Sequence, residues 1–80
     1  MTAQDLYKII SKVCNVEIED IQLDSFFLDD FNSDPTQMQE LREIIEDNIN
    51  EKFDNQQYET VQTVNDLITL IEENSHEFIG

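Results

Sequence analysis

The chain is 80 residues long, which is enough for one small domain with a limited hydrophobic core. It has 19 acidic and four basic side chains, a formal net charge of −15. This charge excludes nucleic acid and anionic membranes as the main target, because both are polyanions. With 39% hydrophobic residues, the chain can still bury a core. We therefore expect one folded domain over residues 1–80, monomeric, whose partner is a protein with a basic surface.

No segment has the composition of a membrane span or a secretory signal. Charged residues are scattered through Met1 to Lys12, and no apolar run approaches the length needed to cross a bilayer. The single cysteine, Cys14, rules out an internal disulfide and falls in a helical pattern where a buried thiol is expected. These features predict a cytoplasmic protein.

An amphipathic helix is predicted at the start of the chain. Apolar residues recur there at spacings of three and four, which places them on one side of a helix. They are Leu6, Ile9, Ile10 and Val13. Thr2 or Gln4 is suited to open this helix, and Asn15 is suited to close it.

A long, strongly acidic loop follows the first helix. From Glu17 to Glu40 the sequence holds eight acidic residues and no basic one. Phe27, Leu28 and Phe31 interrupt the polar residues and are expected to anchor the loop to the core. The sequence therefore predicts an ordered loop with a negative outer face.

The second predicted helix begins at Pro35 and runs to about Phe53. Asp34 can accept hydrogen bonds from the first turn, and proline suits the first helical position because it needs no donor there. Gln37 completes a capping box. The expected inward residues are Met38, Leu41, Ile45 and Ile49, with Ile44 beside them. The expected exposed acidic residues are Glu40, Glu43, Glu46, Asp47 and Glu51.

A short helical turn over residues 56–60 and a final helix from Val64 complete the predicted fold. Thr63 and Asp66 have capping-box spacing at the start of the last helix. Its inward residues are Leu67, Ile68, Leu70 and Ile71. Residues 74–80 are expected to form a frayed tail, with docking of Phe78 and Ile79 as a short apolar anchor as the alternative. The predicted fold class is all-α, with three long helices, one short helix and a long first loop.

The run FLDDFNSDPTQMQEL, from Phe27 to Leu41, joins the loop to the second helix. It resembles the acyl carrier protein family, whose members read roughly F-x-x-D-L-G-x-D-S-L-x-x-x-E-L across the same elements. The alignment needs no gap, and Phe31 stands in place of a leucine. The matching residues are Phe27, Asp30, Asp34, Glu40 and Leu41.

A second stretch supports the same resemblance. ETVQTVNDLITLIEE, residues 59–73, is similar to the closing stretch of that family, roughly E-x-I-x-T-V-x-D-x-x-x-x-I-E. The matching residues are Thr63, Val64, Asp66 and Ile71. With the first helix included, the resemblance covers Leu6 to Glu73 and implies the small four-helix bundle of a carrier protein.

The departures from the family pattern gather at its functional position. Pro35 stands where the family has the serine that carries 4′-phosphopantetheine, the thiol arm that holds acyl groups. Proline has no hydroxyl to modify. Asn32 replaces a usual glycine, and Thr36 replaces a usual leucine. The resemblance therefore implies a carrier-type fold with a degenerate attachment site.

Two functional hypotheses follow from this resemblance. In the first, the module lacks a cofactor and docks on the basic surface of a synthase, ligase or transferase, of the kind used in fatty acid or polyketide biosynthesis. The residues expected at that contact are Asp34, Glu40, Glu43 and Asp47. In the second, a working acyl or peptidyl carrier holds 4′-phosphopantetheine on Ser33, two residues before the family position. The first is favoured because Ser33 precedes Asp34 and falls in the loop, not at the helix start.

The sequence offers no pattern for catalysis or for a dedicated metal site. The sole histidine, His76, has no serine or cysteine placed for it by sequence. Asp30, Asn32 and Asp34 have the spacing of the first three EF-hand ligands. A proline then falls where the EF-hand needs glycine, and a leucine falls where it needs glutamate. We therefore expect neither an enzyme nor a metal protein.

Overall fold

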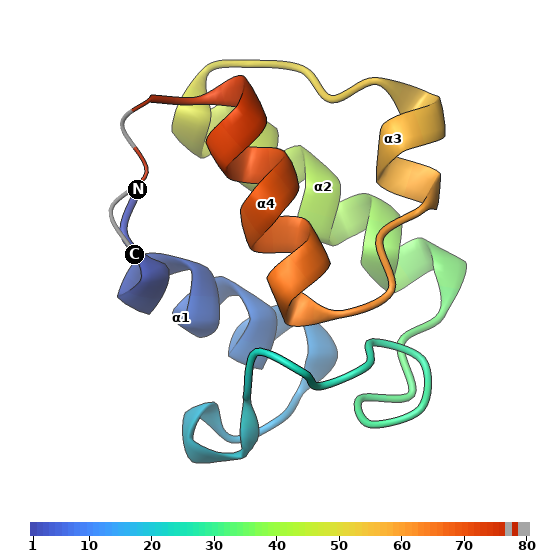
Figure 1. The fold of residues 1–80 in the computed structure, drawn as a ribbon. Coiled ribbons are helices and arrows are strands. Elements are labelled where there is room, and N and C mark those ends of the chain that lie inside the picture. The colour runs from blue at the N-terminus through green and yellow to red at the C-terminus, as the bar shows by residue number, and fades with distance from the viewer. Residues whose placement is uncertain (77, 79–80) are drawn as a thin grey trace.

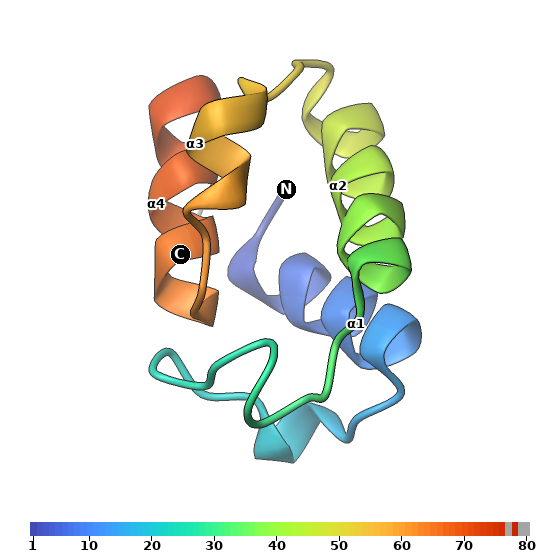
Figure 2. The same cartoon turned by 90° about the vertical axis from the view of Figure 1, so that its right-hand side faces the viewer.

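The computed structural model describes residues 1–76 and 78, and this part of the chain is all-α. Its elements are α1 (Ala3–Cys14), a 3₁₀ turn η1 (Ile18–Asp20), α2 (Pro35–Ile49), α3 (Asn55–Glu59) and α4 (Val64–Asn74). Figure 2 shows α2 and α4 on opposite sides of the bundle, and in Figure 1 and Figure 2 the long loop lies across one end. α1 packs against α2, and α3 packs against α4. The predicted fold class is confirmed.

Each of the three long helices begins at a capping box. The N-cap side chain accepts from the backbone N–H three residues on, and the side chain of that residue accepts from the N–H of the N-cap. The pairs are Thr2 with Asp5, Asp34 with Gln37, and Thr63 with Asp66. These local contacts fix where the helices begin, which is why the predicted starts agree with the structure.

α2 ends earlier than predicted. Its last residue is Ile49, and Asn50 then adopts a left-handed conformation with φ 57° and ψ 39° that closes the helix. The predicted end near Phe53 was wrong because Phe53 is buried in the core. A helix that continued through residue 53 would not let the chain turn back toward α3.

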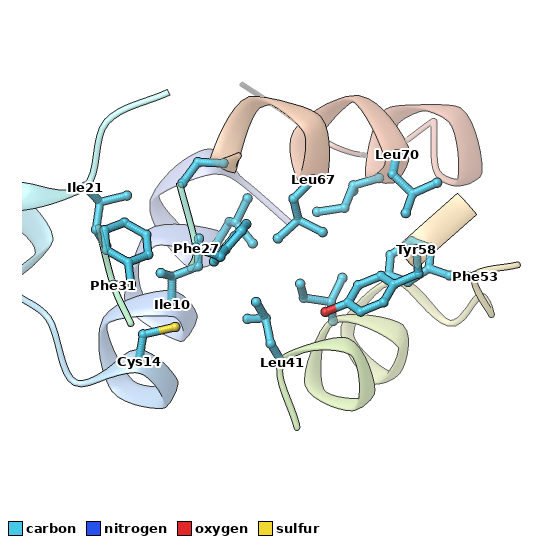
Figure 3. Close-up of a cluster of buried hydrophobic side chains, with 14 residues drawn as sticks. Ile10, Cys14, Ile21, Phe27, Phe31, Leu41, Phe53, Tyr58, Leu67 and Leu70 are labelled. Carbon is cyan, nitrogen blue, oxygen red and sulfur yellow. The ribbon is translucent and has the colours of Figure 1, made fainter. Parts of the chain in front are cut away.

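The core is one apolar cluster to which every long helix and the long loop contribute. Figure 3 shows Ile21 and Phe31 from the loop at one end, Phe53 and Tyr58 at the other, and Leu41 and Leu67 between them. The rings of Phe27 and Phe31 meet edge to face with centroids 5.7 Å apart. If the resemblance to carrier proteins is correct, six apolar residues should converge on one centre, and of these four are buried and two are partly buried against the cluster. They are Phe27, Phe31, Leu41 and Ile45, then Val61 and Ile68.

Leu28 does not anchor the loop as predicted, because 69% of it is exposed. Residues 26–32 form successive tight turns, in which Asp30 N–H donates to the Phe26 carbonyl at 2.9 Å. In such a turn, residues four apart share a side, so Phe27 and Phe31 both point inward and the intervening Leu28 points away.

Glu46 was expected on the exposed face of α2 and is instead buried, with 6% of its surface accessible. Its Oε2 accepts the Phe53 N–H at 2.6 Å and the Arg42 Nε–H at 3.2 Å. Arg42 also donates through an Nη to the Phe53 carbonyl at 2.6 Å. The chain that returns after α2 therefore covers Glu46 and is held by it.

The end of the chain is described only in part. α4 ends at Asn74, and Phe78 lies partly buried against the core. Residues 77, 79 and 80 fall outside the described residues, so the frayed tail over 74–80 stays a prediction. Within the described residues, no helix is both long enough and apolar enough to cross a membrane.

We predict that Glu46→Ala lowers the free energy of unfolding by about 2–4 kcal/mol, because the Phe53 N–H and the Arg42 guanidinium lose their buried acceptor. Urea unfolding monitored by circular dichroism measures the change. The matched control is Glu43→Ala, which removes the same charge from an exposed position of α2 and should change stability by no more than about 0.5 kcal/mol. Equal losses in the two variants would contradict the structural role of Glu46.

Candidate functional site at the start of α2

Hydrogen bonds join the start of α2 to the end of the loop and to α1. The Asp34 carboxylate accepts the Gln37 N–H at 2.7 Å, and the Gln37 side chain accepts the Asp34 N–H at 3.1 Å. The Gln37 Nε2 also donates to the Val13 carbonyl near the end of α1 at 3.4 Å. Pro35 is the first residue of the helix and is exposed. A saturated ring without a hydroxyl therefore occupies the exposed corner.

Ser33 points into the protein, with 6% of its surface accessible. Its Oγ lies 3.3 Å from the Sγ of Cys14 at the end of α1, and its N–H donates to the Phe27 carbonyl at 2.9 Å. Burial raises the pKa of the Cys14 thiol, and the contact with Ser33 acts in the opposite direction. Any group attached to Ser33 would have to break this contact and open residues 27–34.

The residues between the core anchors and α2 have local structural roles. The Asp30 carboxylate accepts the Phe26 N–H at 2.6 Å. Asn32 has a left-handed φ of 52° at the position where the family pattern has glycine, and asparagine tolerates this conformation better than most residues. Within residues 1–76 and 78, no group of three or more histidine, cysteine or acidic side chains is placed to hold a metal ion. His76 is exposed at the other end of the chain.

Three of the four predicted partner-binding residues gather on one face of α2. Glu40, Glu43 and Asp47 are exposed and follow one another at spacings of three and four, which aligns them along the helix. The fourth, Asp34, lies at the start of the same helix, and one of its carboxylate oxygens is engaged in the cap. We call Glu40, Glu43 and Asp47 the α2 acidic face.

An apolar groove next to this corner was missed by the sequence reasoning. It encloses about 340 Å³ between the loop and the residue pair Met38 and Val61, with Phe26 and Leu28 in its wall. We call it the loop groove. The run Phe26–Phe27–Leu28 held the signal, because three consecutive apolar residues in a turn cannot all point inward.

A small helical bundle, with a long ordered loop that leads into a capped second helix, is the architecture of a carrier-protein fold. Comparison with solved structures supports this class. The chain is similar to a protein assigned as an acyl carrier protein, Rv0033 of Mycobacterium tuberculosis. The TM-score is 0.81 at 17% identity, over 88% of this chain and 93% of that chain. At this identity the match establishes an acyl-carrier-protein-like fold. No protein-family model matches the sequence, and no curated protein does.

Cys14 provides a test of whether the segment around Ser33 opens. In the folded protein at pH 8, iodoacetamide should modify Cys14 at least about tenfold more slowly than in urea, because the thiol is buried and its raised pKa leaves little thiolate. Mass spectrometry of timed samples measures the rate. Equally fast modification of the folded chain would show that Ser33 and Cys14 are readily exposed.

Proposed function

We propose that this chain is an acyl-carrier-protein-like module without 4′-phosphopantetheine, and that it acts by docking the α2 acidic face on a basic surface of a partner protein. In this proposal it is not an enzyme. The observation that carries the proposal is Pro35, which is the exposed first residue of α2 in the place of the family's attachment serine.

The chemistry of attachment explains why Pro35 matters. In the transfer reaction, a hydroxyl oxygen attacks the diphosphate of coenzyme A, so that a phosphodiester bond forms to the protein and the adenosine bisphosphate leaves. Proline has no oxygen that can attack. The nearest exposed hydroxyl, on Thr36, follows Pro35 within the first turn of α2, and the transfer test below must therefore include it.

The charge of the module supports docking on a basic partner. Glu40, Glu43 and Asp47 are exposed on one face of a chain whose net charge is −15. Such a field speeds encounter with a positive surface and disfavours negative partners. It is screened within about 8 Å at physiological ionic strength, so complex formation should weaken as salt is added. The partner we propose is a synthase, ligase or transferase, and the proposed location is the cytoplasm.

A working carrier with the arm on Ser33 is the alternative. The Ser33 hydroxyl is buried against Cys14, so a transferring enzyme would first have to separate the loop from α1. An attached phosphodiester would also lie close in sequence to Asp29, Asp30 and Asp34, whose like charges disfavour it. These observations support the proposal over the alternative.

The test is the intact mass of the chain after incubation with a broad-specificity phosphopantetheinyl transferase and coenzyme A. We expect no gain of mass on the native chain and a gain of one arm on Pro35→Ser, since that variant restores the family's hydroxyl at an exposed helix start. Circular dichroism of each variant verifies that it is folded.

Further variants assign any gain that appears on the native chain. A gain abolished by Ser33→Ala would establish a shifted carrier site, and one abolished by Thr36→Val would place the arm on the residue after Pro35. Either result would overturn the proposal. If folded Pro35→Ser is not modified, the corner no longer has the shape that a transferase recognises, and the carrier-like part of the proposal is wrong.

A further inference from the structure

Large apolar side chains are left exposed on one segment of the described chain. They lie in the loop between residues 18 and 28 and are Ile18, Leu23, Phe26 and Leu28. Phe26 is 42% exposed and Leu28 is 69% exposed, and both are in the wall of the loop groove. Exposed apolar groups clustered at a groove mark contact sites more often than isolated ones do.

The loop groove has another hollow beside it along α2. A second hollow of about 540 Å³ lies between α2 and α3 and shares Met38 and Val61 with the loop groove. These two side chains are partly buried against the core and border both hollows. The two hollows therefore lie side by side, and a segment of another protein bound in one would come close to the other.

The loop that forms the groove is held in place by backbone hydrogen bonds to the start of α4 and to the residue pair just before it. Phe27 N–H donates to the Gln62 carbonyl at 2.9 Å, and Val64 N–H donates to the Ser25 carbonyl at 3.1 Å. Asn65 N–H donates to the carbonyl of Leu23 at 2.9 Å. The exposed apolar wall is thus part of a fixed surface, and a partner would lose little binding energy in ordering it.

The charged residues around the loop groove determine which kind of partner segment can bind there. Asp29 lines the loop groove, and Asp34 is exposed at the start of α2, next in sequence to the buried Ser33 at the groove. Arg42, at the α2–α3 hollow, is already engaged by Glu46. An anionic ligand such as a free fatty acid would therefore enter against like charge, whereas lysine or arginine side chains beside an apolar anchor would be attracted.

From these observations we propose that the loop groove binds an apolar side chain, leucine or an aromatic, carried on a basic segment of the partner protein. The partner's basic character rests on the proposed function. The groove adds a contact of different chemistry, because charge on the α2 acidic face speeds encounter and the apolar anchor in the groove slows dissociation.

The test uses a synthetic amphipathic peptide with leucines on one helix face and lysines on the other. A second peptide of equal charge has serines in place of the leucines. Binding is followed by NMR of the methyl groups of the protein. We expect the leucine peptide to shift the methyl signals of Leu28, Met38 and Val61, and to bind roughly tenfold more tightly than the serine peptide.

Matched variants separate the apolar contact from the charge contact. Leu28→Ser should weaken binding of the leucine peptide by roughly tenfold and leave binding of the serine peptide unchanged. Leu23→Ser, which truncates a similarly exposed leucine outside the groove (51% exposed), should affect neither peptide. The double variant Glu40→Lys/Glu43→Lys should weaken binding of both peptides, since it reverses charge on the α2 acidic face.

The failures of the two proposals are distinguishable. If Leu28→Ser has no effect while Glu40→Lys/Glu43→Lys weakens both peptides, the groove inference is overturned and the acidic docking face stands. If the charge reversal has no effect, the proposed docking function fails whatever Leu28→Ser does. A further test uses octyl glucoside below its micelle concentration. If octyl glucoside displaces the leucine peptide and binds the groove as tightly as that peptide does, the groove is a site for an alkyl chain and the inference is overturned.

Discussion

The buried carboxylate of Glu46 is the contact on which the arrangement of α2 and α3 depends. It accepts the Phe53 N–H and the Arg42 guanidinium, and Arg42 lies over the ring of Tyr58 with 5.4 Å to the centroid. The Tyr58 ring stacks on Phe53, and its hydroxyl donates to the Met38 carbonyl at 2.6 Å. One network thus runs from the end of α2, through α3, back to the beginning of α2. Two of the four basic side chains in the whole sequence pair with Glu46, Arg42 at 3.2 Å and the exposed Lys52 at 3.9 Å. They compensate a buried charge that would otherwise be destabilising. The same contacts hold the backbone of Met38, which lines the loop groove.

So acidic a chain folds in part because some of its carboxylates serve as helix caps. In the first turn of a helix, Asp5 accepts one backbone N–H and Asp66 accepts two, and the helix dipole also favours negative charge there. Backbone hydrogen bonds, from Thr2 to Asp5 and from Gln62 and Thr63 to Asp66, lower the pKa of each carboxyl below its ordinary value. Because the folded pKa is the lower one, this stabilisation is present above the ordinary carboxyl pKa and is lost as pH falls through the folded value. Acidification also removes the mutual repulsion of a chain with a charge of −15. The two effects have opposite signs. The change in the free energy of unfolding between neutral and acidic pH therefore reports their difference.

The sequence predicted those features that depend on neighbours in the chain. Capping boxes set the helix starts, and periodic apolar residues identified Leu6, Ile10, Leu41 and Ile45 as core. The resemblance to carrier proteins predicted the fold that the structural comparison supports.

Features set by distant contacts were predicted wrongly. Glu46 falls on the polar side by periodicity, and only the return of Phe53 buries it. The end of α2 depends on the same return. The sequence has one glycine, at its last position. The residues with a left-handed backbone conformation are instead Asn15, Asn32 and Asn50. Of these, only Asn15 was predicted to end a helix. The exposed wall of the loop groove was missed because Leu28 was expected to anchor the loop to the core, whereas 69% of it is exposed.

Pro35 separates two properties that the carrier fold usually combines. A proline at the first position of a helix has the required φ and lacks only an N–H that would have no helical partner. Proline therefore favours the start of α2, although it has no hydroxyl to which an arm could be attached. The capping pair Asp34 and Gln37 does not depend on the residue at position 35. The exposed acidic residues of α2 and the loop groove do not depend on it either. Attachment of an arm requires one oxygen at one place, whereas docking draws on charge and apolar area spread over several residues. A substitution at that single place can therefore abolish the carrier chemistry and leave the means of docking intact, which is the physical basis of the proposed function.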